Sequence, residues 1–170
     1  MASAKRHGVS DFRCALSLAS VLGELGRHSE ALAVLERSRP NREGNAPALA
    51  AHLFIEGACA MHAGTLETAE VTNQLCAEVC RELGESMRLF AVLLNLATLQ
   101  ISMGRVDDAE RGLAEARALL PATHPMWFHM RAITGITLLI RGHWGSARRW
   151  LSEALEIHGV QRPGERVEYQ

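Results

Sequence analysis

The chain has 170 residues, of which 48% are hydrophobic and 22% are charged, a composition typical of one soluble folded domain. Its 18 basic and 19 acidic residues give a net charge of −1, which disfavours a basic face for nucleic acid. No apolar run reaches the roughly 18 residues that a membrane-spanning helix needs. The four cysteines are too few for a disulfide scaffold and favour a reducing compartment, so we expect a cytoplasmic protein.

Apolar periodicity predicts eight helices that follow one another in pairs. Residues 1–10 are expected to form an N-terminal extension, residues 11–160 a single domain, and residues 161–170 a polar tail. The segment 39–45 carries proline, asparagine and glycine and is the clearest loop. The predicted helix pairs span residues 11–25 and 29–38, 46–62 and 66–83, 86–103 and 106–119, and 125–141 and 144–157.

A glycine followed five residues later by an alanine occurs four times, and the glycines are spaced 38, 40 and 38 residues apart. Each glycine ends a helical pattern at a place where a left-handed residue is needed, and glycine adopts that conformation without steric cost. Ser29, Glu67 and Asp107 then favour the start of the next helix. The four pairs are Gly26 and Ala31, Gly64 and Ala69, Gly104 and Ala109, and Gly142 and Ala147.

Small residues also recur seven positions before each glycine and twelve after it, which lets two antiparallel helices approach closely. A leucine lies nine residues after the glycine in three of the four repeats. Asn73 takes that place in the second repeat, so we expect the second helix there to pack less tightly or to sit differently. The repeating unit is therefore a helix hairpin.

These segments resemble tetratricopeptide repeats (TPR), which have small residues, a turn glycine and large apolar residues at the corresponding places. The third repeat carries the pattern in Leu96, Ala97, Gly104, Val106, Ala109, Leu113, Ala116 and Pro121. The fourth carries it in Gly135, Gly142, Trp144, Ala147, Leu151 and Ala154. The resemblance implies an all-α, right-handed α-solenoid of about eight helices, with repeats at residues 11–40, 46–84, 86–121 and 124–159. The period exceeds the family's usual 34 residues and is similar to that of helical sensor regions in large bacterial transcription activators.

The resemblance also implies a concave groove lined by the first helix of each hairpin. The family's groove positions, carried over to this sequence, are mostly apolar and suit a peptide or an amphipathic helix. Asn95 matches a position that binds a partner's carboxylate in some family members. The cations that complete such a clamp are missing, since Lys5 is the only lysine in the chain, and we do not expect one. The predicted groove residues are Leu16, Ser20, Phe54, Ala58, Met61, His62, Ala91, Leu94, Asn95, Thr98, Ile101, His129, Ala132, Ile133, Ile136 and Leu139.

No catalytic or cofactor motif is found, so we expect neither enzymatic activity nor a cofactor. Cys59 with His62, and Cys76 with Cys80, have the spacing of zinc ligands, but the two pairs lie about 10 Å apart along antiparallel helices. No metal site is therefore predicted, and the cysteines are interpreted as packing residues. The three tryptophans of the last repeat are likewise interpreted as core residues.

The last predicted helix carries an apolar stripe that a neighbouring repeat would cover in a longer array. The stripe includes Trp150, Leu151, Ala154 and Leu155 and continues to His158. It predicts self-association, for example as a homodimer, unless the tail or a partner covers it or the chain is part of a longer repeat array.

The function that these features favour is non-enzymatic protein–protein interaction, in which an adaptor or scaffold binds a partner peptide in its apolar groove. Two alternatives stay open. The chain is a sensing or oligomerisation segment of a bacterial transcription regulator, or it is a secretion-type chaperone that shields an apolar segment of a client. Neither direct nucleic-acid binding nor membrane insertion is expected.

Overall fold

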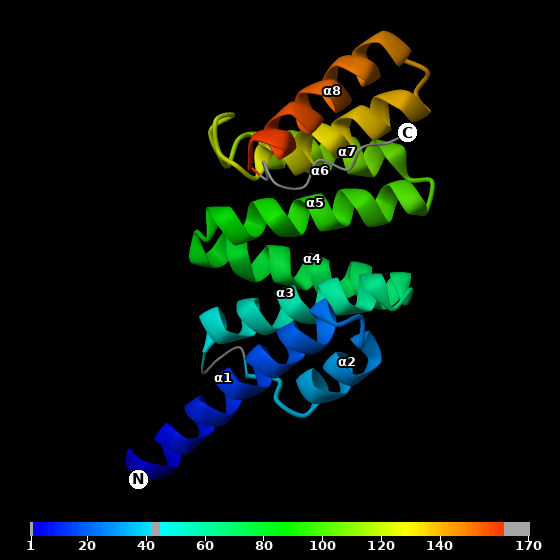
Figure 1. The fold of residues 1–170 in the computed structure, drawn as a ribbon. Coiled ribbons are helices and arrows are strands. Elements are labelled where there is room, and N and C mark those ends of the chain that lie inside the picture. Colours follow the sequence, from blue (N-terminus) through cyan, green and yellow to red (C-terminus); the bar gives the residue numbers. More distant parts are fainter. Residues whose placement is uncertain (1, 42–44, 162–170) are drawn as a thin grey trace. The chain divides into compact units, whose positions relative to one another are not determined.

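The computed structural model describes residues 2–41 and 45–161, with side chains described for residues 12–41 and 45–156. Within these residues there are eight α-helices and no strand, so the all-α class predicted from the sequence is confirmed. The helices are α1 Ala2–Glu24, α2 His28–Glu36, α3 Ala46–His62, α4 Leu66–Leu83, α5 Ser86–Ser102, α6 Val106–Arg117, α7 Trp127–Ile140 and α8 Trp144–Gln161 (Figure 1).

The chain divides into two compact units, Met1–Asn95 and Leu96–Gln170, and the boundary lies inside α5. In the first unit α1 packs against α2, α3 packs against α4, and α2 also contacts α3 (Figure 1). In the second unit α7 packs against α8 and also contacts α6. The TPR-like succession of helix hairpins predicted from the sequence is therefore confirmed within each unit.

Each predicted turn glycine ends its helix in the left-handed conformation. The following residue donates its backbone N–H to the carbonyl five residues earlier, as Arg27 does to Leu22 over 2.8 Å. This Schellman arrangement satisfies carbonyls that the end of a helix leaves unpaired. The φ angles are 73° at Gly26, 78° at Gly64, 76° at Gly104 and 80° at Gly142.

A fifth glycine ends a helix in the same way, outside the repeat frame. Gly84 has φ 68° and separates α4 from α5, and Glu85 N–H donates to the Cys80 carbonyl over 3.0 Å. Because no alanine follows Gly84 five residues later, the search for paired glycine and alanine did not include this turn. The connection between two hairpins thus uses the same helix ending as the turn within a hairpin.

The turns within hairpins also fix where the second helix begins. At the starts of α2, α4 and α6 the N-cap side chain makes no capping hydrogen bond. The repeat alanine instead bonds to the N-cap carbonyl, as Ala31 N–H does to Arg27 over 3.0 Å. Ser29 lies inside α2, so its predicted role as a cap is wrong. Glu67 and Asp107 do lie in the first turns of α4 and α6, where a negative charge is favourable.

The small residues of the repeat mark the places where two helices approach most closely. A Cβ atom on Gly57 would lie 2.5 Å from Asn73 Nδ2, and one on Gly135 would lie 2.6 Å from Leu151 Cγ. Larger residues at these positions would force the helices apart. The repeat alanines Ala31, Ala69, Ala109 and Ala147 are all 0% exposed.

Asn73 does not loosen the second hairpin. Its side chain is fully buried against Gly57, and its Nδ2 donates to the Ala69 carbonyl over 2.8 Å. Its Oδ1 is buried without a partner among the described residues, which costs stability. The crossing is close all the same, and the expectation of looser packing was wrong.

The helix bounds agree with the prediction to within two residues, except at the start of the first helix and the end of the last. The first helix begins at Ala2 instead of residue 11, because no proline interrupts residues 2–10 and their alanine, lysine and arginine favour a helix. The seventh helix begins at Trp127, whose indole N–H donates to the Leu120 carbonyl over 3.1 Å and fixes the preceding loop. The last helix continues to Gln161; the rest of the predicted tail, residues 162–170, lies outside the described residues, as do residues 42–44 of the predicted loop.

A buried polar contact joins the first hairpin to the second. His52 of α3 is fully buried, and its ring centroid lies 6.4 Å from that of Phe12 in α1. Its Nε2 lies 3.5 Å from Glu56 Oε2, while Arg39 Nη1 lies 3.8 Å from Glu56 Oε1. Burial raises the pKa of Glu56, but the contact with His52 and the positive charge of Arg39 outweigh burial and hold the pKa below its usual value.

We expect Gly104→Ala to lower the free energy of unfolding by about 1 kcal/mol or more, because an alanine is strained at positive φ. Gly145 is the matched control, since it lies in α8 with open space around its Cα. Gly145→Ala should raise stability by about 0.5–1 kcal/mol through helix propensity. Urea unfolding measures both changes, and a shift of the same sign in the two variants would contradict this interpretation of the turn.

The depressed pKa of Glu56 predicts a loss of stability in acid. Its contribution is complete above the unfolded-state value of about 4.5 and is lost as the pH falls through the lower folded-state pKa. Glu56→Gln should therefore lower stability near neutral pH and flatten the acid limb of a plot of stability against pH. Glu78→Gln, at an exposed site on α4, is the control. Equal acid limbs for Glu56→Gln and the wild type would show that Glu56 has no such role.

Candidate partner-binding surface

The first unit contains a pocket of about 270 Å³ between α1, α2 and α3. Ser20 from α1 and Phe54, Ala58 and His62 from α3 line it, and all four were predicted to lie in the groove. The spacing of the three α3 residues places them on one helix face. Two helices from different hairpins thus bring predicted groove residues to one concave site.

The other two groove residues predicted in the first two repeats lie elsewhere. Leu16 packs against the buried core cluster formed by residues of α1, α2 and α3. Met61 is half-buried and does not line the pocket. The remaining pocket residues were missed by the sequence analysis, although several lie one residue or one helical turn from predicted ones: Gly23, Glu24, His28, Ile55 and Cys59.

Histidines give this otherwise apolar pocket its polar side. The rings of His28 and His62 are stacked, with centroids 5.2 Å apart and planes at 23°. His28 Nδ1 is buried without a hydrogen-bond partner among the described residues. Glu24 and Ser20 add a carboxylate and a hydroxyl to the lining. A ligand side chain entering the pocket would meet mainly apolar atoms, with polar groups supplied by α1, by His28 of α2 and by His62 of α3.

The groove residues predicted in the third repeat differ in exposure. Leu94 is only 5% exposed, so it serves the core of α5 more than a binding surface. Thr98 is exposed, whereas Ala91, Asn95 and Ile101 are half-buried.

The second unit presents predicted groove residues along α7. Ile136 and Leu139 are large apolar side chains that are 42% and 40% exposed. Ala132 and Ile133 are half-buried on the same helix, and His129 is exposed. This arrangement is an apolar stripe on one helix.

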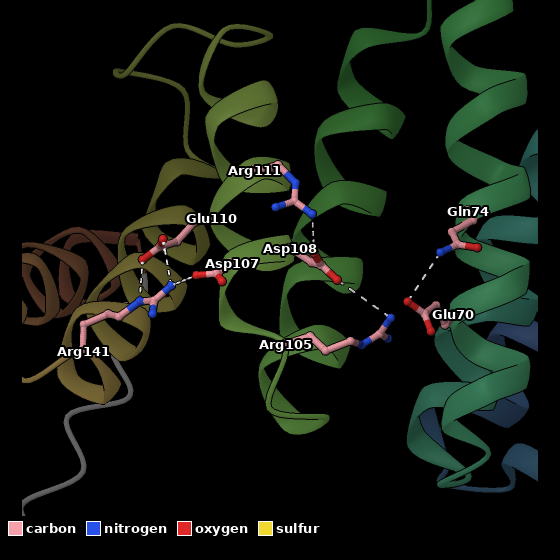
Figure 2. A network of polar contacts seen from close by, with 8 residues as sticks. All are labelled: Glu70, Gln74, Arg105, Asp107, Asp108, Glu110, Arg111 and Arg141. Atoms are coloured by element: carbon pink, nitrogen blue, oxygen red, sulfur yellow. Dashed lines mark hydrogen bonds and ion pairs between the residues drawn. The ribbon is translucent and has the colours of Figure 1, made fainter.

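Ion pairs of α6 dominate the polar surface of the second unit (Figure 2). The Arg141 guanidinium contacts Asp107 and also donates to both Glu110 oxygens over 3.3 Å, and these hydrogen bonds raise its pKa. Asp108 pairs with Arg105, three residues before it, and with Arg111, three residues after it. Acidic neighbours therefore offset the positive charge of Arg141.

The predicted self-association face on α8 is only partly open. The Arg117 guanidinium lies 5.7 Å from the centroid of the Trp150 ring, Leu151 packs on Gly135, and Ala154 is 6% exposed. Leu155 is 72% exposed. The side chain of His158, which continues the predicted stripe, lies outside the described residues.

The tryptophans of the last repeat are not all core residues as predicted. Trp127 is 6% exposed and belongs to the core, and Trp150 is half-buried. Trp144, at the start of α8, is 69% exposed, so the prediction was wrong for this residue. Its position at the first residue of the helix leaves it without a preceding turn to pack against.

The cysteines take part in packing. Cys76 is fully buried, and its thiol donates to the Ala50 carbonyl over 3.4 Å. Burial raises the pKa of the Cys59, Cys76 and Cys80 thiols. In the part of the chain that the structure describes, no three histidine, cysteine or acidic side chains are grouped to hold a metal ion. Among the helices of the described residues, none is long and apolar enough to span a membrane.

We expect one fast-reacting thiol in the native protein. Cys14 is exposed, whereas Cys59, Cys76 and Cys80 are buried and have raised pKa values, which lower their thiolate content. Titration with a coloured disulfide reagent should give a single rapid equivalent, with the other three thiols released only on unfolding. Cys14→Ser should abolish the rapid phase, and a rapid phase that survives this substitution would contradict the assigned burial.

Comparisons with known proteins add a similarity of architecture. No protein-family model matches the chain, and no curated protein matches it significantly. The chain is similar to the crystal structure of nearly identical TPR-like repeats of a protein named as a kinesin light chain from Podosopora anserina. The match covers 89% of this chain and 96% of that chain, with 15% sequence identity and a TM-score of 0.46. The hairpin interpretation rests on the turn glycines and helix crossings described above.

Proposed function

We propose that this chain is a non-enzymatic protein–protein interaction module that binds a peptide or helix of a partner protein. The observation that supports this function is the pocket in the first unit. Ser20 from one hairpin and Phe54, Ala58 and His62 from the next hold groove positions that the tetratricopeptide resemblance implies, and they line one pocket.

The size and lining of the pocket favour side chains of a peptide over a cofactor. Small-molecule sites usually measure about 300–1,000 Å³, and this pocket of about 270 Å³ lies below that range. It suits one or two apolar anchor residues, whose burial contributes about 25 cal/mol per Å² of apolar surface. The histidines and Glu24 at its polar side would orient the backbone or a polar neighbour of the anchor.

The second unit supports binding of the same class of partner. The exposed Ile136 and Leu139 on α7 form an apolar stripe that an amphipathic helix would cover with side chains spaced three and four residues apart. Exposed leucine and isoleucine side chains in a row are costly unless a partner buries them. We therefore propose that α7 provides a separate contact area for a partner of the same class.

The pocket assignment predicts that Ala58→Arg weakens peptide binding about tenfold or more, which corresponds to about 1.4 kcal/mol. Ala58 is half-buried in the pocket wall, so an arginine there would fill the space meant for the anchor residue. Peptides selected from a random display library on the wild-type protein serve as the probe, and fluorescence anisotropy measures their affinity.

Val71→Arg is the matched control, because Val71 is 65% exposed on α4 and lies outside the pocket. It should bind the selected peptides as the wild type does. Circular dichroism and urea unfolding check that both variants are folded. The proposed site is wrong if selection enriches no peptide, or if Ala58→Arg binds the enriched peptides as tightly as Val71→Arg.

A further inference from the structure

An exposed apolar stripe runs along α1 on the first hairpin. Leu18, Val21 and Leu25 are 50%, 52% and 65% exposed, and Cys14 one turn earlier is also exposed. Their spacing of four, three and four residues places them on one helix face. Beside the stripe, between α1 and α2, lies a hollow of about 330 Å³ that Leu18 and Cys14 help to line. This stripe was not predicted from the sequence.

The repeat frame shows that these positions normally face a neighbouring hairpin. Counted back from the turn glycine, the places of Cys14 and Val21 are occupied in the second repeat by His52 and Cys59, which are 0% and 4% exposed. The same two places in the later repeats are also buried: Val92 0%, Leu99 1%, Met130 0% and Thr137 2%. Only the first repeat exposes them.

Two junctions inside the units show which residues cover this face. At the junction of α2 with α3, Arg39 Nη1 lies 3.8 Å from Glu56 Oε1, and Leu35 belongs to the same buried cluster as Cys59. Arg39 lies thirteen residues after its turn glycine, and Glu56 lies eight before the next one.

The junction of α6 with α7 repeats this pairing. Arg117 and Leu113 of α6 line one cavity with Thr134 and Thr137 of α7, and they hold the same places in the repeat frame as the four residues at the first junction. At both junctions, the residue thirteen positions after one turn glycine therefore lies by the residue eight positions before the next turn glycine. The ninth residue after one glycine likewise meets the fifth before the next.

On the last hairpin, the α8 residues that hold the covering positions of this junction are more exposed than their equivalents. Leu155 lies thirteen residues after Gly142 and is 72% exposed. Leu151 lies nine residues after it and is half-buried, although its equivalents Leu35 and Leu113 are 0% and 3% exposed. The first hairpin thus presents the α1 face that is covered at an internal junction, and the last hairpin presents the α8 residues that would cover such a face. Neither meets its counterpart among the described residues.

We propose that a second copy of this chain covers the α1 stripe with its α8, in a head-to-tail contact that repeats the internal hairpin junctions. By the frame, Leu155 of one copy meets Leu18 of the other, and Leu151 meets Val21. The hollow beside Leu18 receives the Leu155 side chain. Both places are leucine here, so this part of the contact between copies is apolar, whereas the internal junction of α2 with α3 holds the ion pair of Arg39 and Glu56.

Sedimentation equilibrium of the full chain over a range of concentrations tests the contact. The wild type should associate as its concentration rises, whereas Leu18→Glu and Leu155→Glu should each remain monomeric. An equal mixture of the two variants should form a two-chain species that does not grow further, because each variant retains one intact half of the junction. This outcome is expected for a heterologous contact, which joins two different surfaces. It is not expected for a self-complementary contact, which joins the same surface of both copies.

The controls are Ser17→Glu, at an exposed position beside the stripe, and Ser146→Glu, on the opposite side of α8 from Leu155. Both should associate as the wild type does. Circular dichroism confirms that each variant is folded, and Val21→Glu replaces Leu18→Glu if that variant is not. The proposal is overturned if the wild type is monomeric throughout, if either single variant still dimerises alone, or if the mixture stays monomeric.

Discussion

The close crossing of two helices just before and after a left-handed glycine is the constraint on which the rest of the structure depends. Only small residues fit there, as the contact of Gly57 with Asn73 shows. The glycine turn sets where the first helix ends, and the backbone bond from the repeat alanine sets where the second begins. Helix ends and helix crossing are thus fixed by the same few residues, and the large apolar side chains fill the space that remains.

This constraint gives each position of the repeat frame similar neighbours, which explains why several predicted groove residues line one pocket. Side chains on one face of the first helix, such as Phe54 and Ala58, point away from their own hairpin partner and line a pocket with the preceding hairpin. Side chains on another face, such as Cys59, meet the second helix of that hairpin. A residue's distance from its glycine therefore predicts its neighbours better than its chemical type does.

The fold could be predicted from the sequence because its signals are local: glycine, small residues and apolar periodicity mark the hairpins without knowledge of distant contacts. The site was predictable only in part. Leu16 was assigned to the groove but packs in the core, and His28 was missed although it lines the pocket. Both outcomes depend on the angle at which α2 packs against α3. The α1 stripe was missed for another reason. The sequence shows that Leu18 and Val21 are apolar, but only the structure shows that nothing in the described chain covers them.

The distribution of polar residues is the reverse of what a self-contained monomer would favour. Inside the first unit, the junction of α2 with α3 holds Arg39 and Glu56, whose side chains are 48% and 16% exposed, and contacts with Arg39 and His52 compensate the Glu56 carboxylate. On the first and last hairpins, Leu18 and Leu155 occupy the equivalent places and are exposed. A polar side chain there would remain in water and would not lower stability. The proposed contact between copies would remove the exposed leucines from water, and the internal junction would keep its ion pair. The same frame that orders the hairpins within the chain can therefore order one copy against the next.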